Sequence, residues 1–286
     1  MTRFHETLHA HYGQYFGVDE VLFEGGSDHQ RLVIFNNASL GRVMALDGVI
    51  QITEADEHIY SEIISHVPLF AHPAPRRVLI IGFGDGTVQS EVLKHSQLQK
   101  VVSVEIDGAV VQLCREYLPR NVGVLDDPRH QLVIADGVAY IEERGPGFDV
   151  IICNSTDPQG PGAVLFTQAF YQACHARLNE GGVLVTQNGV PFLQPEELKN
   201  SAERFAPHFA DWHFFRAAIP TYVGGDMAFG WAARDHSLRA VAPATLRQRW
   251  QAAAISTRYY NPEVHLAAFA LPQAWLTVIG KADNQS

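Results

Sequence analysis

The residues of this chain best placed to do chemistry are polar side chains that follow apolar, strand-like runs. Glu105 ends the run KVVSVE, Asp136 follows QLVIA, and Asn154 follows VIIC. Because open α/β sheets bind ligands at the carboxyl ends of their strands, we expect these side chains to line one crevice. Glu105 is suited to hydrogen-bond both hydroxyls of a ribose, and Asp136 with Gly137 to meet an adenine amino group. The pattern predicts a nucleoside site, although acids also end strands without any such role.

A glycine-rich turn precedes these strand ends. The stretch IIGFGDG places Gly82, Gly84 and Gly86 between a strand and a helix, with G-x-G-x-G spacing instead of the G-x-G-x-x-G of dinucleotide folds. Taken alone, it indicates only a tight strand-to-helix turn. Asp85 lies within the turn, where a carboxylate would repel a pyrophosphate and attract a cation. The combination favours a sulfonium nucleoside over NAD.

The elements that must position these residues alternate between strand and helix. Helical spacing occurs in the ranges 54–69, 88–94, 109–117, 138–142 and 166–178, and strand-like runs occur at 77–81, 100–105, 130–134, 149–153 and 182–187. Strands that alternate with helices predict a mainly parallel sheet with right-handed crossovers. We therefore expect an α/β, Rossmann-like (class I methyltransferase-like) sheet of seven strands with helices on both faces.

The first 54 residues show a different pattern. Short β-like runs at 21–23, 31–35, 42–46 and 49–53 are separated by Gly25-Gly26, Asn36-Asn37 and Asp47-Gly48. An Asp-Gly pair between two such runs is a strong hairpin signal. The sequence therefore predicts a small antiparallel β domain over residues 1–54 and a Rossmann-like catalytic domain over residues 55–286.

Composition narrows the function. The 286 residues are 47% hydrophobic and 18% charged, and the net charge of −10 argues against nucleic acid as a partner and fits a cationic small substrate. The three cysteines form no CxxC pair, the N-terminus has no apolar signal core, and no apolar run approaches the ~18 residues of a membrane span. We expect a cytoplasmic protein with no membrane partner. His5, His9 and His11 lack further ligands, so we expect no metal site there.

The motifs, taken in order, resemble those of the spermidine synthases, the polyamine aminopropyltransferases, and most closely their bacterial branch. The resemblance covers nearly the whole chain and rests on the stretches HETLHAHYGQYF, DHQRLVIFNNASLGRVMALDGVIQITEADEHIYSE, VLIIGFGDG, VEID, DDPRHQLVIADG, STDPQGPG, LFTQAFYQAC, QNGVPFL, AAIPTYVGGDMAFGWA and RYYNPEVHLAAFALP. It implies transfer of an aminopropyl group from decarboxylated S-adenosylmethionine to putrescine or a related amine. The products would be spermidine and methylthioadenosine. It also implies a co-substrate instead of a tightly bound cofactor, no metal, and a homodimer or homotetramer.

The resemblance also assigns roles to matching positions. It places the aminopropyl donor against Gln30, Asp85, Glu105, Asp136 and Gly137, with Pro161 near the thioadenosine. It lines the amine channel with Tyr60, Asp157 and Tyr222, where aromatic rings pack a methylene chain and attract ammonium groups. The residues nearest the chemistry would be Asn154, Asp157 and Tyr60, and the loop from Asp157 to Leu165 would close over them and exclude water.

Asn154 departs from the family pattern, because it occupies the position of the family's proton-accepting aspartate. An amide has no useful basicity, and general-base assistance is worth roughly 10²–10⁴ in rate. Phe83, Ser61 and Asp226 also differ from the bacterial pattern. We expect these changes to cluster around the reacting groups. A phenyl ring at Phe83 would either narrow the donor crevice or point into the core.

Three interpretations of Asn154 remain open from the sequence. In the first, the enzyme still transfers aminopropyl groups, and Asp157 or a water takes the proton. In the second, loss of a carboxylate admits intact S-adenosylmethionine, and a 3-amino-3-carboxypropyl or methyl group moves. In the third, the chain binds a nucleoside or polyamine without turnover.

Overall fold

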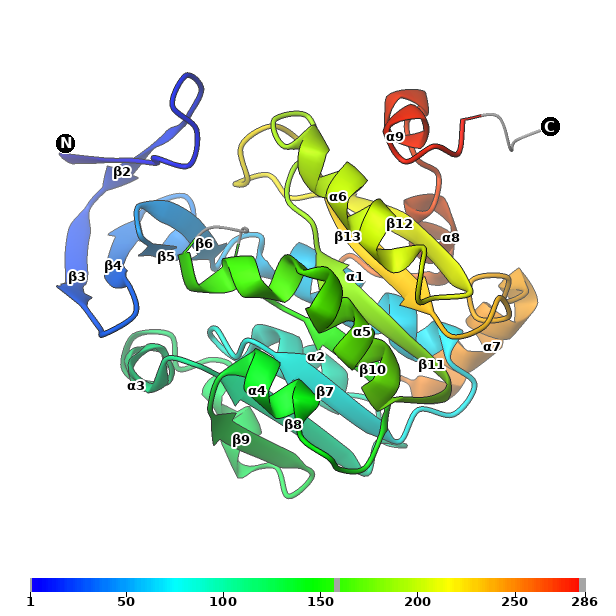
Figure 1. Cartoon of the computed structure of the whole chain (residues 1–286). Coiled ribbons are helices and arrows are strands. Elements are labelled where there is room, and N and C mark those ends of the chain that lie inside the picture. Colours follow the sequence, from blue (N-terminus) through cyan, green and yellow to red (C-terminus); the bar gives the residue numbers. More distant parts are fainter. Residues whose placement is uncertain (1, 157–159, 283–286) are drawn as a thin grey trace.

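A four-stranded sheet near the N-terminus lies beside a seven-stranded sheet at the centre of the helical part (Figure 1), and a two-stranded hairpin precedes both in the chain. The computed structural model describes residues 2–156 and 160–282. The N-terminal strands lie at one end of the molecule, and the two ends of the chain are at opposite sides (Figure 1). The central sheet carries helices on both faces, as the alternating pattern predicted.

The N-terminal part consists of antiparallel strands. A hairpin of β1 (Thr2–His5) and β2 (Tyr15–Val18) precedes a sheet in the order β3-β4-β5-β6, with bounds Glu20–Gly26, Arg31–Asn37, Gly41–Leu46 and Val49–Thr53. Asp47 and Gly48 connect β5 to β6 with φ of 49° and 83°. Two successive positive φ values are what a two-residue hairpin turn requires, so the predicted Asp-Gly hairpin is confirmed.

The central sheet has seven strands within the described residues, in the order β12-β13-β11-β10-β7-β8-β9. The parallel strands are β7 (Arg77–Ile81), β8 (Lys100–Glu105), β9 (His130–Ile134), β10 (Phe148–Cys153) and β11 (Leu178–Gln187). The strands β12 (Asp211–Ala218) and β13 (Asp226–Ala233) add an antiparallel edge. The mainly parallel, Rossmann-like sheet is therefore confirmed.

The helices cover both faces of this sheet and keep its apolar strands from water (Figure 1). Their bounds are α1 (Glu57–Ala71), α2 (Thr87–Leu93), α3 (Gly108–Tyr117), α4 (Gly137–Glu142), α5 (Gln168–Arg177), α6 (Pro195–Phe205), α7 (Pro243–Ala253), α8 (Pro262–Ala268) and α9 (Gln273–Val278), with 3₁₀ turns at Val122–Asp126 and Gly160–Phe166. The described residues include no helix that is long and apolar enough to cross a bilayer.

Two of the predicted helices begin two or three residues later than expected, for identifiable reasons. The helix expected over 166–178 begins at Gln168, because the Thr167 hydroxyl accepts the Phe170 N–H at 3.2 Å and caps the first turn. The helix expected over 54–69 begins at Glu57, because Asp56 holds a turn in which its carboxylate accepts the Thr53 hydroxyl at 2.6 Å.

Helix α1 is held in place by a buried carboxylate. Glu62 is 1% exposed and accepts the backbone N–H groups of Arg258, Tyr259 and Tyr260, each at 2.8 Å. Three N–H donors satisfy a charge that would otherwise be costly to bury. The C-terminal segment is thereby tied to the helix that carries Tyr60, two residues before Glu62.

Burial at His265 makes the stability of this fold depend on pH. Burial lowers the pKa of His265 to about 3 from 6.5, so between these values the unfolded chain binds a proton that the folded chain does not. Above pH 6.5 this imidazole is neutral in both the folded and the unfolded chain. As the pH falls below 6.5, protonation of the unfolded chain lowers the free energy of unfolding, by up to about 1.4 kcal/mol per pH unit. We expect His265→Gln to flatten the fall in unfolding free energy between pH 6.5 and 5, measured by urea denaturation.

The control is His236→Gln, because the His236 side chain is 78% exposed. This variant should keep the wild-type dependence on pH. Parallel curves for the wild type and His265→Gln would contradict the prediction.

Candidate active site

A cavity of about 420 Å³ lies between the N-terminal sheet and the carboxyl ends of the central strands. Eight of the predicted site residues line it, namely Gln30, Tyr60, Asp85, Glu105, Asp136, Gly137, Asn154 and Tyr222. Asp157 lies outside the described residues, and so does the side chain of Pro161, so their predicted roles stay predictions. The predicted closing loop is described only from Gly160 onward, where Gly162, Val164 and Leu165 also line the cavity.

The glycine turn brings the ends of β7 and β10 into backbone contact. Gly82, Gly84 and Gly86 have φ of 95°, 58° and 85°, which side chains other than glycine rarely adopt. A Cβ atom on Gly82 would lie 2.0 Å from the Asn154 carbonyl oxygen, and the Asn154 N–H donates to the Ile81 carbonyl at 2.8 Å. Glycine at 82 is therefore what allows Asn154 to sit beside the turn.

Glu105 is held rigidly at the end of β8. Its two carboxylate oxygens accept the backbone N–H groups of Phe83 at 2.7 Å and Asp107 at 2.9 Å, and the residue is 8% exposed. Each oxygen keeps a lone pair for a further donor. The arrangement suits a pair of hydroxyl groups held against a fixed carboxylate.

Asp85 is also buried, and it bonds within its own turn. Its carboxylate accepts the Thr87 N–H at 3.1 Å, the Thr87 hydroxyl, and the Asn121 amide at 3.1 Å. These donors stabilise the ionised carboxylate at 5% exposure. Asp85 thus brings negative charge into the cavity.

Gln30 reaches the cavity from the N-terminal sheet. Its amide donates to Asp107 at 3.1 Å, and the Ser27 hydroxyl donates to the same carboxylate at 2.5 Å. Asp107 also caps helix α3 by accepting the Ala109 N–H at 3.0 Å. Sequence reasoning missed Asp107, although its position two residues after Glu105 and before a helix was a capping signal.

Asp136 and Gly137 form the far rim of the cavity. The Asp136 carboxylate accepts the Val138 N–H at 2.7 Å and caps helix α4. A Cβ atom on Gly137 would lie 2.6 Å from the Ile81 side chain, so glycine keeps the helix close to β7. A flat ring system can approach the sheet edge between these residues because no side chain projects from Gly137.

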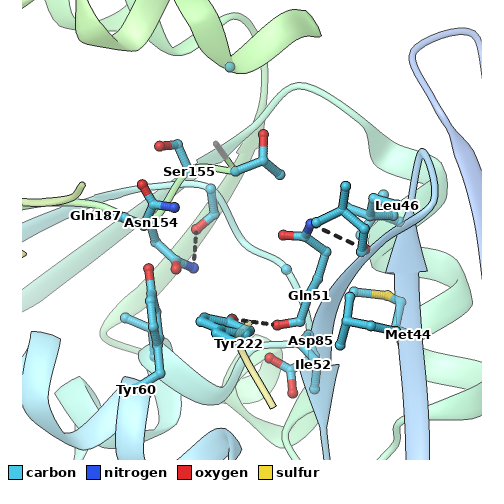
Figure 2. Close-up of a pocket in the computed structure, with 18 of the residues that line it drawn as sticks. Met44, Leu46, Gln51, Ile52, Tyr60, Asp85, Asn154, Ser155, Gln187 and Tyr222 are labelled. Atoms are coloured by element: carbon cyan, nitrogen blue, oxygen red, sulfur yellow. Dashed lines mark hydrogen bonds between the residues drawn. The ribbon is translucent and has the colours of Figure 1, made fainter. Parts of the chain in front are cut away.

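Two tyrosines line the other half of the cavity. The rings of Tyr60 and Tyr222 meet edge-on with centroids 6.3 Å apart, and the Tyr222 hydroxyl donates to the Gln51 carbonyl at 2.7 Å (Figure 2). Asp56 fixes the loop before Tyr222, because its carboxylate accepts the N–H and hydroxyl of Thr221 at 2.9 and 2.8 Å. The aromatic wall is therefore tied to both the N-terminal sheet and helix α1.

Two amides face the cavity near these rings. Figure 2 shows Asn154 and Gln187 among the side chains arranged around the pocket with Tyr60 and Tyr222. The Asn154 amide N–H donates weakly to the Gly82 carbonyl at 3.5 Å. Gln187 is 4% exposed, and its side-chain carbonyl oxygen has no hydrogen-bond partner among the described residues. Sequence reasoning missed Gln187, although it ends its strand as Glu105 ends another. Asn188, the next residue, is buried and bonds Thr186 and Ser201.

Glu57 is a second lining residue that sequence reasoning missed. Its side chain is 11% exposed and pairs with Arg120. Burial, reinforced by the Asp85 carboxylate, raises the pKa of Glu57 from 4.5 to about 7, although Arg120 opposes the shift. The available signal was spacing, since Glu57 precedes Tyr60 by one helical turn.

Within the described residues, no group of histidine, cysteine or acidic side chains is arranged to hold a metal ion.

The four departures from the expected pattern do not all reach the cavity. Phe83 is fully buried in the core and Asp226 pairs with Arg216, so neither side chain belongs to the described lining. The expectation that the changes cluster around the reacting groups was therefore wrong for these two, because a turn and a strand end each have an inner and an outer face. Ser61 and Asn154 do line the cavity, and the Ser61 hydroxyl donates to the Glu57 carbonyl at 2.8 Å.

Comparison with known families and proteins gives consistent matches. The model "Spermine/spermidine synthase domain" matches residues 57–240, and "Spermidine synthase tetramerisation domain" matches residues 3–54. A polyamine aminopropyltransferase of Pseudomonas aeruginosa is 56% identical over 285 residues, which cover 99% of this chain and 100% of that protein. One from Erwinia tasmaniensis is 52% identical over 96% of this chain and 97% of its own length.

Solved structures agree with the fold. A crystal structure of spermidine synthase in complex with the transition-state analogue AdoDATO has a TM-score of 0.93 at 38% identity, covering 98% of this chain and 95% of that one. Spermidine synthase from Thermotoga maritima has a TM-score of 0.91 at 37% identity, covering 98% and 94%.

The contact between β7 and β10 predicts an unequal response to two substitutions. Gly82→Ala should lower the free energy of unfolding by about 2–5 kcal/mol, because it adds a clash with the Asn154 carbonyl to a left-handed backbone. Gly84→Ala is the matched control, because its Cβ atom would come no closer than 4.0 Å to Asn154. It should cost about 1–2 kcal/mol, the backbone part alone. Equal losses of unfolding free energy in the two variants, measured by urea denaturation, would show that the close approach at Gly82 contributes nothing.

Proposed function

Because the chain belongs to the spermine/spermidine synthase family and is a polyamine aminopropyltransferase, we propose that it uses decarboxylated S-adenosylmethionine as donor and putrescine or a related diamine as acceptor. The observation that carries this proposal is the convergence of residues from the N-terminal sheet, helix α1 and the central strand ends on one cavity. That cavity has a carboxylate-rich half, suited to a sulfonium nucleoside, and an aromatic half, suited to a methylene chain.

The nucleoside would lie along the strand ends. Glu105 would accept the ribose hydroxyl groups, and Asp136 with Gly137 would meet the adenine. Gln30 would reach the donor from the N-terminal sheet, and Pro161 would pack near the thioadenosine. The fixed position of Glu105, held by two backbone N–H groups, supports this placement, because a rigid acceptor selects for a matching pair of donors.

The transfer itself needs a nucleophile, a good leaving group and little else. The lone pair of the acceptor amine attacks the methylene carbon next to the sulfonium. The carbon–sulfur bond breaks and its electron pair returns to sulfur, which leaves neutral methylthioadenosine. One proton is lost from the amine nitrogen overall. The chain's contribution is to orient the two substrates at short range and to keep water out.

The acceptor would lie along the aromatic half of the cavity. Tyr60 and Tyr222 would pack its methylene groups and attract its ammonium end. Asp157 would pair with one of its amino groups. The Tyr222 ring is kept from turning away by its hydroxyl contact with Gln51, which supports a fixed channel wall.

Asn154 would hold the attacking amine without taking its proton. An amide oxygen accepts a hydrogen bond from an amine but has no useful basicity. The attacking nitrogen would therefore lose its proton to Asp157 or to a water before attack. Free amine is scarce at neutral pH, because an alkyl ammonium resembles that of lysine, with a pKa of about 10.4.

The carboxylates of the donor half argue against intact S-adenosylmethionine. Asp85 and Glu105 already place buried negative charge there. A donor carboxylate close to them would be repelled, by about 1–4 kcal/mol for a pair ~4 Å apart. The loss of one carboxylate at Asn154 does not remove the charge on the other side of the cavity.

We also propose how the parts of the chain are used. The boundary between the two domains would fall at residues 54 and 55, and the N-terminal domain would support assembly as a homodimer or homotetramer. The family model that matches residues 3–54 is described as a tetramerisation domain, which supports an oligomer. The proposed setting is the cytoplasm, where both substrates would be available as small soluble molecules.

Product identification tests the proposed reaction. The purified chain, incubated with decarboxylated S-adenosylmethionine and a panel of amines, should release methylthioadenosine and spermidine with putrescine, as seen by mass spectrometry. Intact S-adenosylmethionine should give no 3-amino-3-carboxypropyl or methyl product. Turnover of the intact donor alone would replace the proposed donor, and saturable binding with no turnover of either donor would make the chain a binder.

Restoring a carboxylate should accelerate the reaction. We expect Asn154→Asp to raise kcat at pH 7 roughly 10²-fold, because a positioned base would take the proton of the acceptor amine. Asn154→Ala is the control and should show no gain in rate, since alanine supplies no base and also lacks the amide that would hold the amine. The wild-type rate should climb with pH as free amine accumulates. An acidic limb near pH 5 in the wild type would reveal a carboxylate base, as Asp157 would be, and would exclude water as the proton acceptor.

A further inference from the structure

We propose that Glu57 is a specificity-determining residue of this site. Together with Asp85 it forms a seat for the ammonium group of the aminopropyl donor, and it releases its proton to solvent when that ammonium binds. The inference rests on the donor proposed above and adds to it a residue and a proton that the strand-end motifs do not contain.

The position of Glu57 carries the first part of the argument. It is the first residue of α1, one turn before Tyr60, and it lines the same cavity as Asp85. Its side chain is 11% exposed, so little water remains around its carboxyl group. A carboxyl group in this position is shielded from solvent and lies at the cavity wall.

The charges around Glu57 come from three other elements. Asp85 belongs to the glycine turn, Glu54 to the turn before α1, and Arg120 to the segment after α3. Arg120 also lies 3.7 Å from Glu54, so its single positive charge is shared between two carboxylates. Asp85 also acts on Glu57, so the group contains three carboxylates and one guanidinium, and its charge balance lacks a cation.

This imbalance of charge has a measurable consequence before a ligand binds. Burial and the Asp85 carboxylate raise the pKa of Glu57 to about 7, so near neutral pH a proton partly supplies the missing positive charge. A bound ammonium would supply that charge instead. The neutral Glu57 carboxyl would then become a carboxylate paired with the ammonium, and its proton would pass to solvent.

A separate observation concerns the aromatic half of the same cavity, where a buried acceptor lacks an N–H donor. The buried side-chain carbonyl of Gln187 has no hydrogen-bond partner among the described residues. Buried polar atoms are nearly always satisfied in proteins, so an unmatched acceptor on a cavity wall points to a donor that the ligand brings.

The seat would also discriminate between donors. In the decarboxylated donor, the carbon that bears the ammonium is a CH₂ group of the propyl chain. In intact S-adenosylmethionine, the same carbon bears a carboxylate. Binding that ammonium would therefore bring a carboxylate against Glu57 and Asp85. The added negative charge would favour the neutral form of Glu57. Like charges placed together at a binding site exclude the wrong partner.

Calorimetry on two ligands tests the proposal. Methylthioadenosine keeps the nucleoside but lacks both the aminopropyl ammonium and the sulfonium charge, so it is the uncharged control ligand. In two buffers of different ionisation enthalpy at pH 7, the decarboxylated donor should release about half a proton from the wild type, because the pKa of Glu57 is about 7. Methylthioadenosine should release none.

Variants separate recognition from structure. Glu57→Gln should weaken binding of the decarboxylated donor roughly ten- to a hundredfold and abolish its proton release, while methylthioadenosine binding changes less than twofold. Glu54→Gln removes the other carboxylate beside Arg120, outside the described cavity lining. It should keep binding both ligands, but its proton release at pH 7 should fall below one half, because the Glu54 charge helps to raise the pKa of Glu57. Arg120→Gln should raise the proton release at pH 7 above one half.

The wild type alone supplies a second test if Glu57→Gln does not fold. Its affinity for the decarboxylated donor should rise with pH up to about 7 and then level off, while its affinity for methylthioadenosine stays constant. The proposal would be overturned if a folded Glu57→Gln protein lost affinity for both ligands equally, or kept its affinity for the donor. It would also be overturned if the wild type released no proton. Each of these results is compatible with aminopropyl transfer by the wild type, so the proposed reaction would stand or fall separately in the product assay.

Discussion

Buried negative charge along one edge of the central sheet is the constraint that organises this protein. Asp85, Glu105 and Asp107 are each less than a tenth exposed, and burying a carboxylate is costly unless donors surround it. The chain provides those donors from its own backbone and from neighbouring amides and hydroxyls. The glycine turn, the capped helix starts and the Gln30 contact all serve this purpose as well as shaping the cavity. Glu57 is the exception, because it relies on a proton or on Arg120.

The site is composite because the charges must be enclosed. Strand ends alone form an open edge, where water would weaken every electrostatic contact. The N-terminal sheet closes this edge through Gln30, which bonds Asp107, and through Gln51, whose carbonyl holds Tyr222. Helix α1 is held from the other side by Glu62 and the C-terminal segment. Distant parts of the chain therefore determine how dry and how rigid the cavity is.

The two halves of the cavity differ in polarity. Carboxylates dominate where the sulfonium nucleoside would bind, whereas the amides Asn154 and Gln187 stand near the aromatic wall where an amine would attack. A sulfonium is a permanent cation and benefits from fixed negative charge. An attacking amine has to be neutral, and amides hold a neutral amine without stabilising its protonated form. Asn154, where the family resemblance predicts an acid, would thus change the proton balance of the acceptor half and leave the donor half intact.

The sequence alone determined the features that depend on local order. Alternating strands and helices, the Asp47-Gly48 hairpin and the polar strand ends at Glu105, Asp136 and Asn154 are set by neighbours within a few residues. These predicted the fold, and the chain order of parallel strands predicted that the strand ends would meet. The motifs also led to Tyr60, Tyr222 and Gln30, which the fold brings to the same cavity. The roles expected for Asp157 and Pro161 stay predictions.

Only the tertiary structure decided the features that depend on distant partners. The raised pKa of Glu57 arises from burial together with Asp85 and Arg120, which lie 28 and 63 residues further along the chain. The orientations of Phe83 and Asp226 were equally hidden, because a turn or strand residue has two faces and only packing chooses between them. Periodicity tells which side of an element is apolar, but it does not tell which charges will face each other across a cavity. That is a matter of spatial neighbours, and these exist only once the chain has folded.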